Sequence, residues 1–129
     1  MESNPGAVLL RIPAASAYLS LARATTTATC ARLDFSLDQL QDITLAVDEA
    51  LSLVLLDAVP GSELVCRWTP QPTGVLIDIS STSTSGRTPR TTTFAWMVLT
   101  ALVDKATANI QDGVVTLSLQ AARAQAVVS

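Results

Sequence analysis

The side chains that could do chemistry in this sequence are carboxylates and hydroxyls. The 129-residue chain contains no histidine, which excludes Ser-His-Asp and Cys-His nucleophile pairs and any site in which histidine holds zinc or haem. Two carboxylates are adjacent at Asp48 and Glu49, and ten of the fourteen residues from 80 to 93 are serine or threonine. Any catalysis must therefore use a carboxylate, a hydroxyl or a bound ion.

The charge pattern argues against a polyanionic partner. Eight basic and eleven acidic residues give a net charge of -3, and seven of the bases are arginines scattered from Arg11 to Arg123. Without a basic stripe we expect no direct nucleic-acid binding. The start of the chain is acidic and turn-forming, and the longest uncharged helical stretch, 91–103, is shorter than the roughly 20 apolar residues of a membrane span. We therefore expect a soluble, cytoplasmic protein with no leader and no membrane contact.

The two cysteines, Cys30 and Cys66, lie on different predicted elements. In a chain with no sign of secretion, buried free thiols are the expected state and a disulfide is the alternative.

The first half of the chain predicts one strand followed by two helices. Residues 7–12 alternate as a strand, with Val8, Leu10 and Ile12 on one face. A first helix is predicted over 16–33 from apolar residues at helical spacing. These apolar residues are Tyr18, Leu21, Ala22, Ala28 and Leu33.

The second helix is marked by a capping box, in which Ser36 is the N-cap and Gln39 follows three residues later. It is predicted to run to about residue 58. Residues at three- and four-residue steps give it one continuous core-facing side. They are Leu40, Ile43, Val47, Ala50, Val54 and Ala58.

The second half predicts strands at 62–69 and 75–80, a mobile loop over 80–93, a helix over 94–106, a short strand at 108–111 and a last strand over 115–119. Asp112-Gly113 is a hairpin turn signal. This order predicts an α+β two-layer sandwich: a mainly antiparallel sheet of four to five strands, covered on one face by three helices. We expect a single domain over 1–129, with flexible ends at 1–6 and 122–129.

The order of elements, together with Leu-Ala-Val-Asp-Glu-Ala at 45–50 and Ala-Leu-Val-Asp at 101–104, resembles the anti-sigma-factor serine kinases of the RsbW and SpoIIAB type. These belong to the GHKL ATPase superfamily, whose fold is also called the HATPase or Bergerat fold. The resemblance spans residues 9 to about 119, and segment 94–102 is most similar to actinobacterial, mycobacterial-type members.

The resemblance implies a nucleotide site whose motifs are largely replaced here. In active relatives, a helical Glu-Ala-x-x-Asn motif supplies a general base and an asparagine for Mg²⁺. Glu49 and Ala50 match this motif, but Leu53 stands at the asparagine position. A leucine has no oxygen to offer to magnesium, which prefers hard oxygen ligands.

The glycine motifs of the family are replaced as well. The Asp-x-Gly-x-Gly motif that holds adenine falls on Ser81, Ser83 and Ser85, and the Gly-x-Gly pair at the phosphates falls on Thr93 and Ala95. We therefore expect no bound cofactor and no metal site. Mg-ATP or Mg-ADP is the expectation only if the pocket still functions, with Glu49 as a weak or vestigial base. The simpler reading of Glu49 is a solvated helix carboxylate.

Partner binding is the property that we expect to be retained. In the family, an Ala-Arg pair on the first helix faces the sigma factor and its antagonist, and Ala22-Arg23 occupies the matching position. An arginine fork can hold a carboxylate through two hydrogen bonds; the alternative is an ordinary exposed arginine. Five carboxylates and no base lie on the second helix, either as a solvated face or as a contact for basic regions of a sigma factor.

The favoured function is that of an anti-sigma factor. It would be a homodimer that sequesters an alternative, stress-response sigma factor and is released by a STAS-domain anti-anti-sigma antagonist. The first alternative is an active serine/threonine protein kinase that phosphorylates the antagonist with ATP. The second is an interaction module unrelated to transcription, in which the 80–93 loop, in place of the ATP lid, is a phosphorylation target or only a flexible linker.

Overall fold

A computed structural model describes residues 6–124 as two layers, a five-stranded sheet and a layer of helices. The strands are β1 (Val8–Pro13), β2 (Glu63–Gln71), β3 (Gly74–Thr82), β4 (Lys105–Gln111) and β5 (Val114–Ala122). The helices are α1 (Leu19–Cys30), preceded by a 3₁₀ turn (Ser16–Tyr18), α2 (Leu37–Leu56) and α3 (Phe94–Leu102). Every strand pair is antiparallel, in the order β1-β2-β3-β5-β4. The expected α+β class is confirmed.

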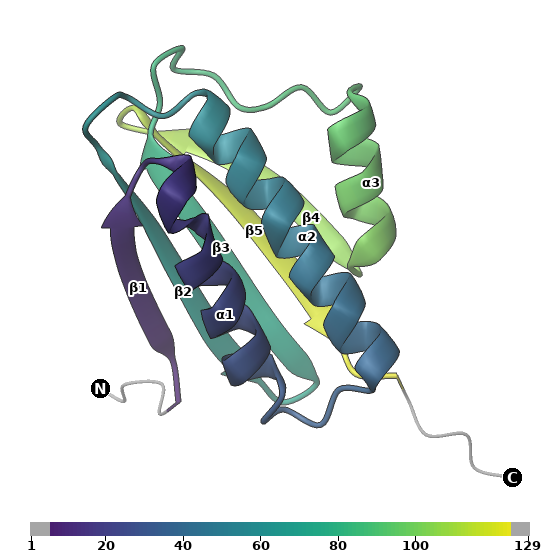
Figure 1. Ribbon diagram of the computed structural model, residues 1–129. Helices are drawn as coiled ribbons and strands as arrows, with labels where there is room; N and C mark the ends of the chain where they lie inside the picture. The colour runs from purple at the N-terminus through teal and green to yellow at the C-terminus, as the bar shows by residue number, and fades with distance from the viewer. Residues whose placement is uncertain (1–5, 125–129) are drawn as a thin grey trace, which may run out of the picture.

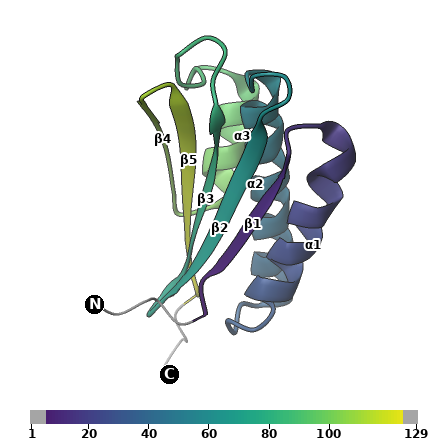
Figure 2. The same ribbon diagram turned by 90° about the vertical axis from the view of Figure 1, so that its left-hand side faces the viewer.

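The three helices cover one face of the sheet, and no element formed by residues 6–124 covers the other face (Figures 1 and 2). Strand alternation follows this division because successive side chains point to opposite faces. In β3, the side chains of Val75, Ile77 and Ile79 are buried, whereas Leu76 and Asp78 lie on the open face and are only half-buried. The predicted alternation of this strand is confirmed.

Helix α2 supplies the largest part of the helical core. Its capping box forms as predicted: the Ser36 hydroxyl accepts a hydrogen bond from the Gln39 N–H, and the Gln39 side chain accepts one from the Ser36 N–H. Its buried face is broader than predicted, since it also includes Ala46 and Leu51. The helix ends at Leu56 rather than at residue 58.

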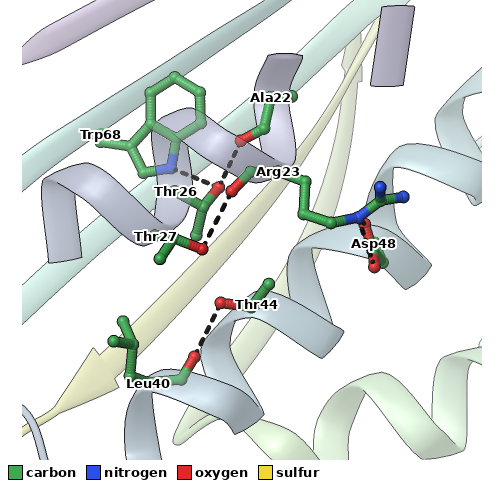
Figure 3. A network of polar contacts seen from close by, with 8 residues as sticks. All are labelled: Ala22, Arg23, Thr26, Thr27, Leu40, Thr44, Asp48 and Trp68. Atoms are coloured by element: carbon green, nitrogen blue, oxygen red, sulfur yellow. Dashed lines mark hydrogen bonds and ion pairs between the residues drawn. The ribbon is translucent and has the colours of Figure 1, made fainter. Parts of the chain in front are cut away.

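The buried face of α1 differs from the prediction. The predicted apolar residues Tyr18 and Leu21 are exposed, and the buried residues are Ala22, Thr26 and Cys30. Thr26 is fully buried because its hydroxyl donates to the Ala22 carbonyl and accepts a hydrogen bond from the indole N–H of Trp68, at 3.1 Å (Figure 3). Of the predicted residues, Ala22 is thus buried as expected, and Thr26, a polar side chain with partners, takes a place expected for an apolar one.

Several boundaries in the second half also differ. Strand β3 continues through Thr82, so the Ser/Thr-rich segment outside regular structure begins at residue 83. Helix α3 ends at Leu102, because Val103 has extended backbone angles, and β4 begins at Lys105. The hairpin turn at Asp112-Gly113 is confirmed, with positive φ at both residues.

Of the ends expected to be flexible, residues 1–5 and 125–129 lie outside the described part of the chain. Residues 122 and 123 are held in place. Ala122 closes β5, and the Arg123 guanidinium donates hydrogen bonds to the carbonyls of Leu33 and Pro72. Within residues 6–124, no helix is long and apolar enough to cross a membrane.

Candidate functional site

A cavity of about 280 Å³ lies at the C-terminal end of α2, next to the N-cap residue of α3 and the rest of the 83–93 segment. Side chains from α2 and β5 form an apolar wall, and residues of the 83–93 segment and its junction with α3 form the rest. The lining residues are Leu53, Val54, Leu56, Asp57, Ser85, Arg87, Thr88, Pro89, Arg90, Thr93 and Val115. The cavity is therefore mainly apolar, with two guanidinium groups on the loop side.

Asp57, the C-cap of α2, is the one carboxylate in this lining and is bound to the loop. It accepts hydrogen bonds from the Ser83 hydroxyl, the Ser85 hydroxyl and the Ser85 N–H, and its own carbonyl accepts one from the Thr84 N–H. The hydrogen bond from Ser83, followed by the one from the Ser85 hydroxyl, lowers the pKa of Asp57 below its usual value. The start of the 83–93 segment is thus fixed to the end of α2.

The residues at the nucleotide-motif positions separate into two groups. Leu53, Ser85 and Thr93 line the cavity, and the Thr93 hydroxyl caps α3 by accepting a hydrogen bond from the Trp96 N–H. Ser81 and Ser83 do not line it; both are buried. Ser81 lies on the helix-covered face of β3, with its hydroxyl 3.4 Å from that of Ser62.

Ala95 is half-buried in the first turn of α3 and is not part of the lining. Glu49 is half-buried on α2, one helical turn before Leu53 and therefore on the same flank of the helix. Within residues 6–124, its carboxylate forms no hydrogen bond with another side chain and no ion pair. In the same part of the chain, no group of three or more Cys, Asp and Glu side chains is placed to hold a metal ion.

The predicted partner-binding residues lie on α1, which packs beside α2 on the side away from α3 (Figure 1). Ala22 is fully buried, so it cannot contact a partner directly and can only support the exposed residues around it. Arg23 is exposed and its Nε donates to both oxygens of Asp48, at 2.8 and 3.0 Å (Figure 3). Neither of its Nη atoms forms a hydrogen bond within residues 6–124.

Sequence reasoning missed the roles of Asp48 and Asp57. The sequence presents both only as carboxylates of the acidic second helix, with Asp48 also adjacent to Glu49. A signal for Asp57 was present, because it follows Leu53 by one helical turn and must share its flank. No local signal pairs Asp48 with Arg23, which is 25 residues away.

Five antiparallel strands lie under three helices, which is the arrangement that the resemblance predicts. No family model matches the sequence, and no curated protein matches it either. Among solved structures, the chain is similar to "The crystal structure of the RsbU and RsbW domains of Rv1364c from Mycobacterium tuberculosis", with a TM-score of 0.70 and 18% sequence identity. The match covers 95% of this chain and 35% of that one, so this chain spans about a third of its length.

The lining of the cavity does not fit Mg-nucleotide in the way that the resemblance implies. Leu53 puts an apolar side chain at the position where the resemblance implies an oxygen ligand, and the Asp57 carboxylate is already bound by the hydroxyls of Ser83 and Ser85. The remaining polar groups of the lining are hydroxyls and guanidinium groups, and guanidinium groups do not coordinate cations.

Proposed function

We propose that the chain is an anti-sigma factor of the RsbW type that works by binding rather than by catalysis. It sequesters an alternative, stress-response sigma factor in the cytoplasm, as a homodimer, and a STAS-domain antagonist releases that sigma factor. The observation that carries the proposal is that the Leu53 side chain lines the cavity; the resemblance implies that an oxygen ligand for magnesium stands at this position in active relatives. Partner binding needs only the folded surface, whereas phosphoryl transfer also needs the side-chain oxygen that holds magnesium.

Support for a binding role comes from the helical side of the molecule. Arg23 is exposed, held by Asp48, and has both Nη atoms free of hydrogen bonds within the described residues. Inhibition by occlusion requires no covalent step, because a protein that covers the DNA-binding surface of a sigma factor prevents promoter engagement.

The first test is direct binding. The chain is immobilised, and each purified sigma factor of the source organism is passed over it in biolayer interferometry. We expect saturable binding to one alternative sigma factor and displacement by a STAS-domain protein. If no sigma factor binds, the proposal is wrong.

The second test separates binding from catalysis. Isothermal titration with Mg-ADP should give no saturable heat in the sub-millimolar range. Leu53→Asn restores an amide oxygen at the ligand position and is the matched variant. Saturable binding by the wild type, together with Glu49-dependent transfer of the γ-phosphate of added ATP to the antagonist with release of ADP, would establish the kinase alternative instead.

A further inference from the structure

The cavity at the C-terminal end of α2 does not fit Mg-nucleotide, but its lining combines an apolar wall with cationic groups. Side chains of α2, β5 and the loop form the apolar wall: Leu53, Val54, Leu56, Val115 and Pro89. The volume of about 280 Å³ is near the lower end of the range of about 300 to 1,000 Å³ for small-molecule sites. The wall can therefore cover a small apolar body.

The cationic part of the lining comes from Arg87 and Arg90 of the 83–93 segment. Within residues 6–124, neither guanidinium group donates a hydrogen bond or forms an ion pair. The one carboxylate of the lining, Asp57, is bound by the hydroxyls of Ser83 and Ser85 instead. Two guanidinium groups and one carboxylate give the lining a net charge of +1, which matches a monoanion rather than the several negative charges of a nucleotide without its metal.

The backbone next to each of these arginines is anchored. The Arg87 N–H donates to Ser85 Oγ at 3.1 Å, and the same hydroxyl donates to Asp57 at 2.8 Å. The Arg90 carbonyl accepts a hydrogen bond at 3.2 Å from the hydroxyl of Thr93, the N-cap of α3. Both arginines are thus attached to fixed points of the fold while their guanidinium groups stay available. A site that is formed before its ligand arrives loses less conformational entropy on binding.

We propose that the cavity binds a small organic monoanion, a carboxylate with an aliphatic chain, without metal and without nucleotide. The carboxylate lies on the guanidinium groups of Arg87 and Arg90, because a planar guanidinium holds a carboxylate through two parallel hydrogen bonds. The chain lies along the wall that contains Leu53 and Leu56. Such a ligand joins the 83–93 segment to α2, and its binding does not depend on the proposed function.

The probe is octanoate, titrated into the full 129-residue chain without magnesium and followed by two-dimensional NMR. We expect saturable shifts at the amides of Leu56, Thr88 and Thr93, with a dissociation constant of roughly 1 mM or below. Hexanoate, which is shorter by two methylenes, should bind about tenfold more weakly. Octanamide has the same length but no charge and should also bind about tenfold more weakly. Equal affinities for octanoate and octanamide, or for octanoate and hexanoate, would overturn the proposal.

Substitutions locate the probe. Arg87→Gln and Arg90→Gln should each weaken octanoate binding about tenfold, and Leu53→Asn about fivefold. Matched controls lie on the open face of the sheet, where Arg67 is exposed and Leu9 is 48% exposed. Arg67→Gln and Leu9→Asn should change the affinity less than twofold. Equal effects of cavity and control variants would show that the proposal is wrong, and thermal unfolding of every variant separates a lost site from lost folding.

Trypsin provides a second readout, because it cleaves after Arg87 and Arg90. Saturating octanoate covers both guanidinium groups and joins the segment to α2, so it should slow cleavage at these two bonds about tenfold. Octanamide at the same concentration should leave the rate unchanged. Unchanged cleavage with saturating octanoate would place the probe elsewhere and contradict the proposal.

Two outcomes separate this site from the proposed function. If Mg-ADP displaces octanoate in the sub-millimolar range, the cavity is a nucleotide site and the monoanion proposal is wrong. If a sigma factor binds in biolayer interferometry but octanoate gives no saturable shifts, the monoanion site falls and the proposed function stands. If octanoate binds as described and no sigma factor does, the site stands and the proposed function falls.

Discussion

The carboxylate of Asp57 accepts two hydrogen bonds from Ser85, one from its backbone N–H at 3.0 Å and one from its hydroxyl at 2.8 Å. This contact joins the C-terminal end of α2 to a loop residue 28 positions further along the chain. Ser85 in turn accepts a hydrogen bond from the Arg87 N–H, at 3.1 Å. A carboxylate thus organises the loop that borders the cavity, in a fold where the resemblance implies a nucleotide lid.

Removal of the Asp57 carboxylate should destabilise the protein and release the loop. Asp57→Ala loses three hydrogen bonds to a charged acceptor, but the group is partly solvated, so we expect a loss of about 1 to 2 kcal/mol in the free energy of unfolding. Urea denaturation measures this loss, and limited proteolysis within residues 86–92 measures loop opening. The control Asp112→Asn, in a hairpin turn, should leave the loop protected. Unchanged proteolysis of Asp57→Ala would contradict the assigned role.

The same carboxylate predicts a dependence of stability on acid pH. The pKa of Asp57 is lowered in the folded state, so its contribution is fully present above its ordinary pKa of 3.8 and is lost as the pH falls through the lowered folded value. The difference in unfolding free energy between wild type and Asp57→Asn should therefore be constant from about pH 7 to pH 5 and shrink toward about pH 2. A constant difference over the whole range would exclude Asp57 as the source.

Thr26 should be needed as the acceptor for the buried indole of Trp68. Thr26→Val preserves shape but leaves the Nε1–H without a partner in the core, which costs about 1 to 3 kcal/mol. Thr26→Ser keeps the hydroxyl and should be milder. Thr27→Val on the exposed side of α1 is the control, expected within about 0.5 kcal/mol of wild type. Thermal unfolding followed by tryptophan fluorescence compares the three variants.

The two thiols should be inert in the folded protein. Burial raises the pKa of Cys30 and of Cys66 to about 11, so the reactive thiolate is scarce near neutral pH. Ellman's reagent at about pH 8 should modify neither thiol until urea unfolds the chain. The same shift in pKa makes stability depend on pH. The free energy of unfolding is unaffected below the ordinary pKa of 9.0 and falls as the pH rises from there through about 11, because the unfolded chain ionises its thiols first. Rapid modification of the native protein would show that a thiol is accessible.

Much of the fold could be predicted because local patterns and tertiary packing agree. The capping box at Ser36, the alternation from Val75 to Ile79 and the Asp112-Gly113 turn are short-range signals, and each is present in the structure. The errors fell where a local pattern was ambiguous. Apolar spacing alone predicts the buried face of α1. Thr26 is nevertheless buried there, because the indole N–H of a tryptophan 42 residues away donates a hydrogen bond to its hydroxyl.

The candidate site shows the same division. That residue 53 carries no side-chain oxygen is read from the sequence alone, and the resemblance implies that this is the family's metal-ligand position. Which side chain on another element each carboxylate of α2 meets could not be decided in this way. Successive helical residues are rotated by about 100°, so Asp48 and Glu49 diverge, and only the packing of α1 places Asp48 against Arg23.

The sequence by itself thus determined the types of chemistry that are possible. The chain has no histidine, residue 53 has no side-chain oxygen, and the first helix carries an arginine. Only the tertiary structure decided which groups are already occupied. Asp48 is paired with Arg23, and Asp57 with the loop serines, through contacts 25 to 28 residues apart. A hydrogen bond acts over about 3 Å, so its partners are known only once the helices and strands have been packed together.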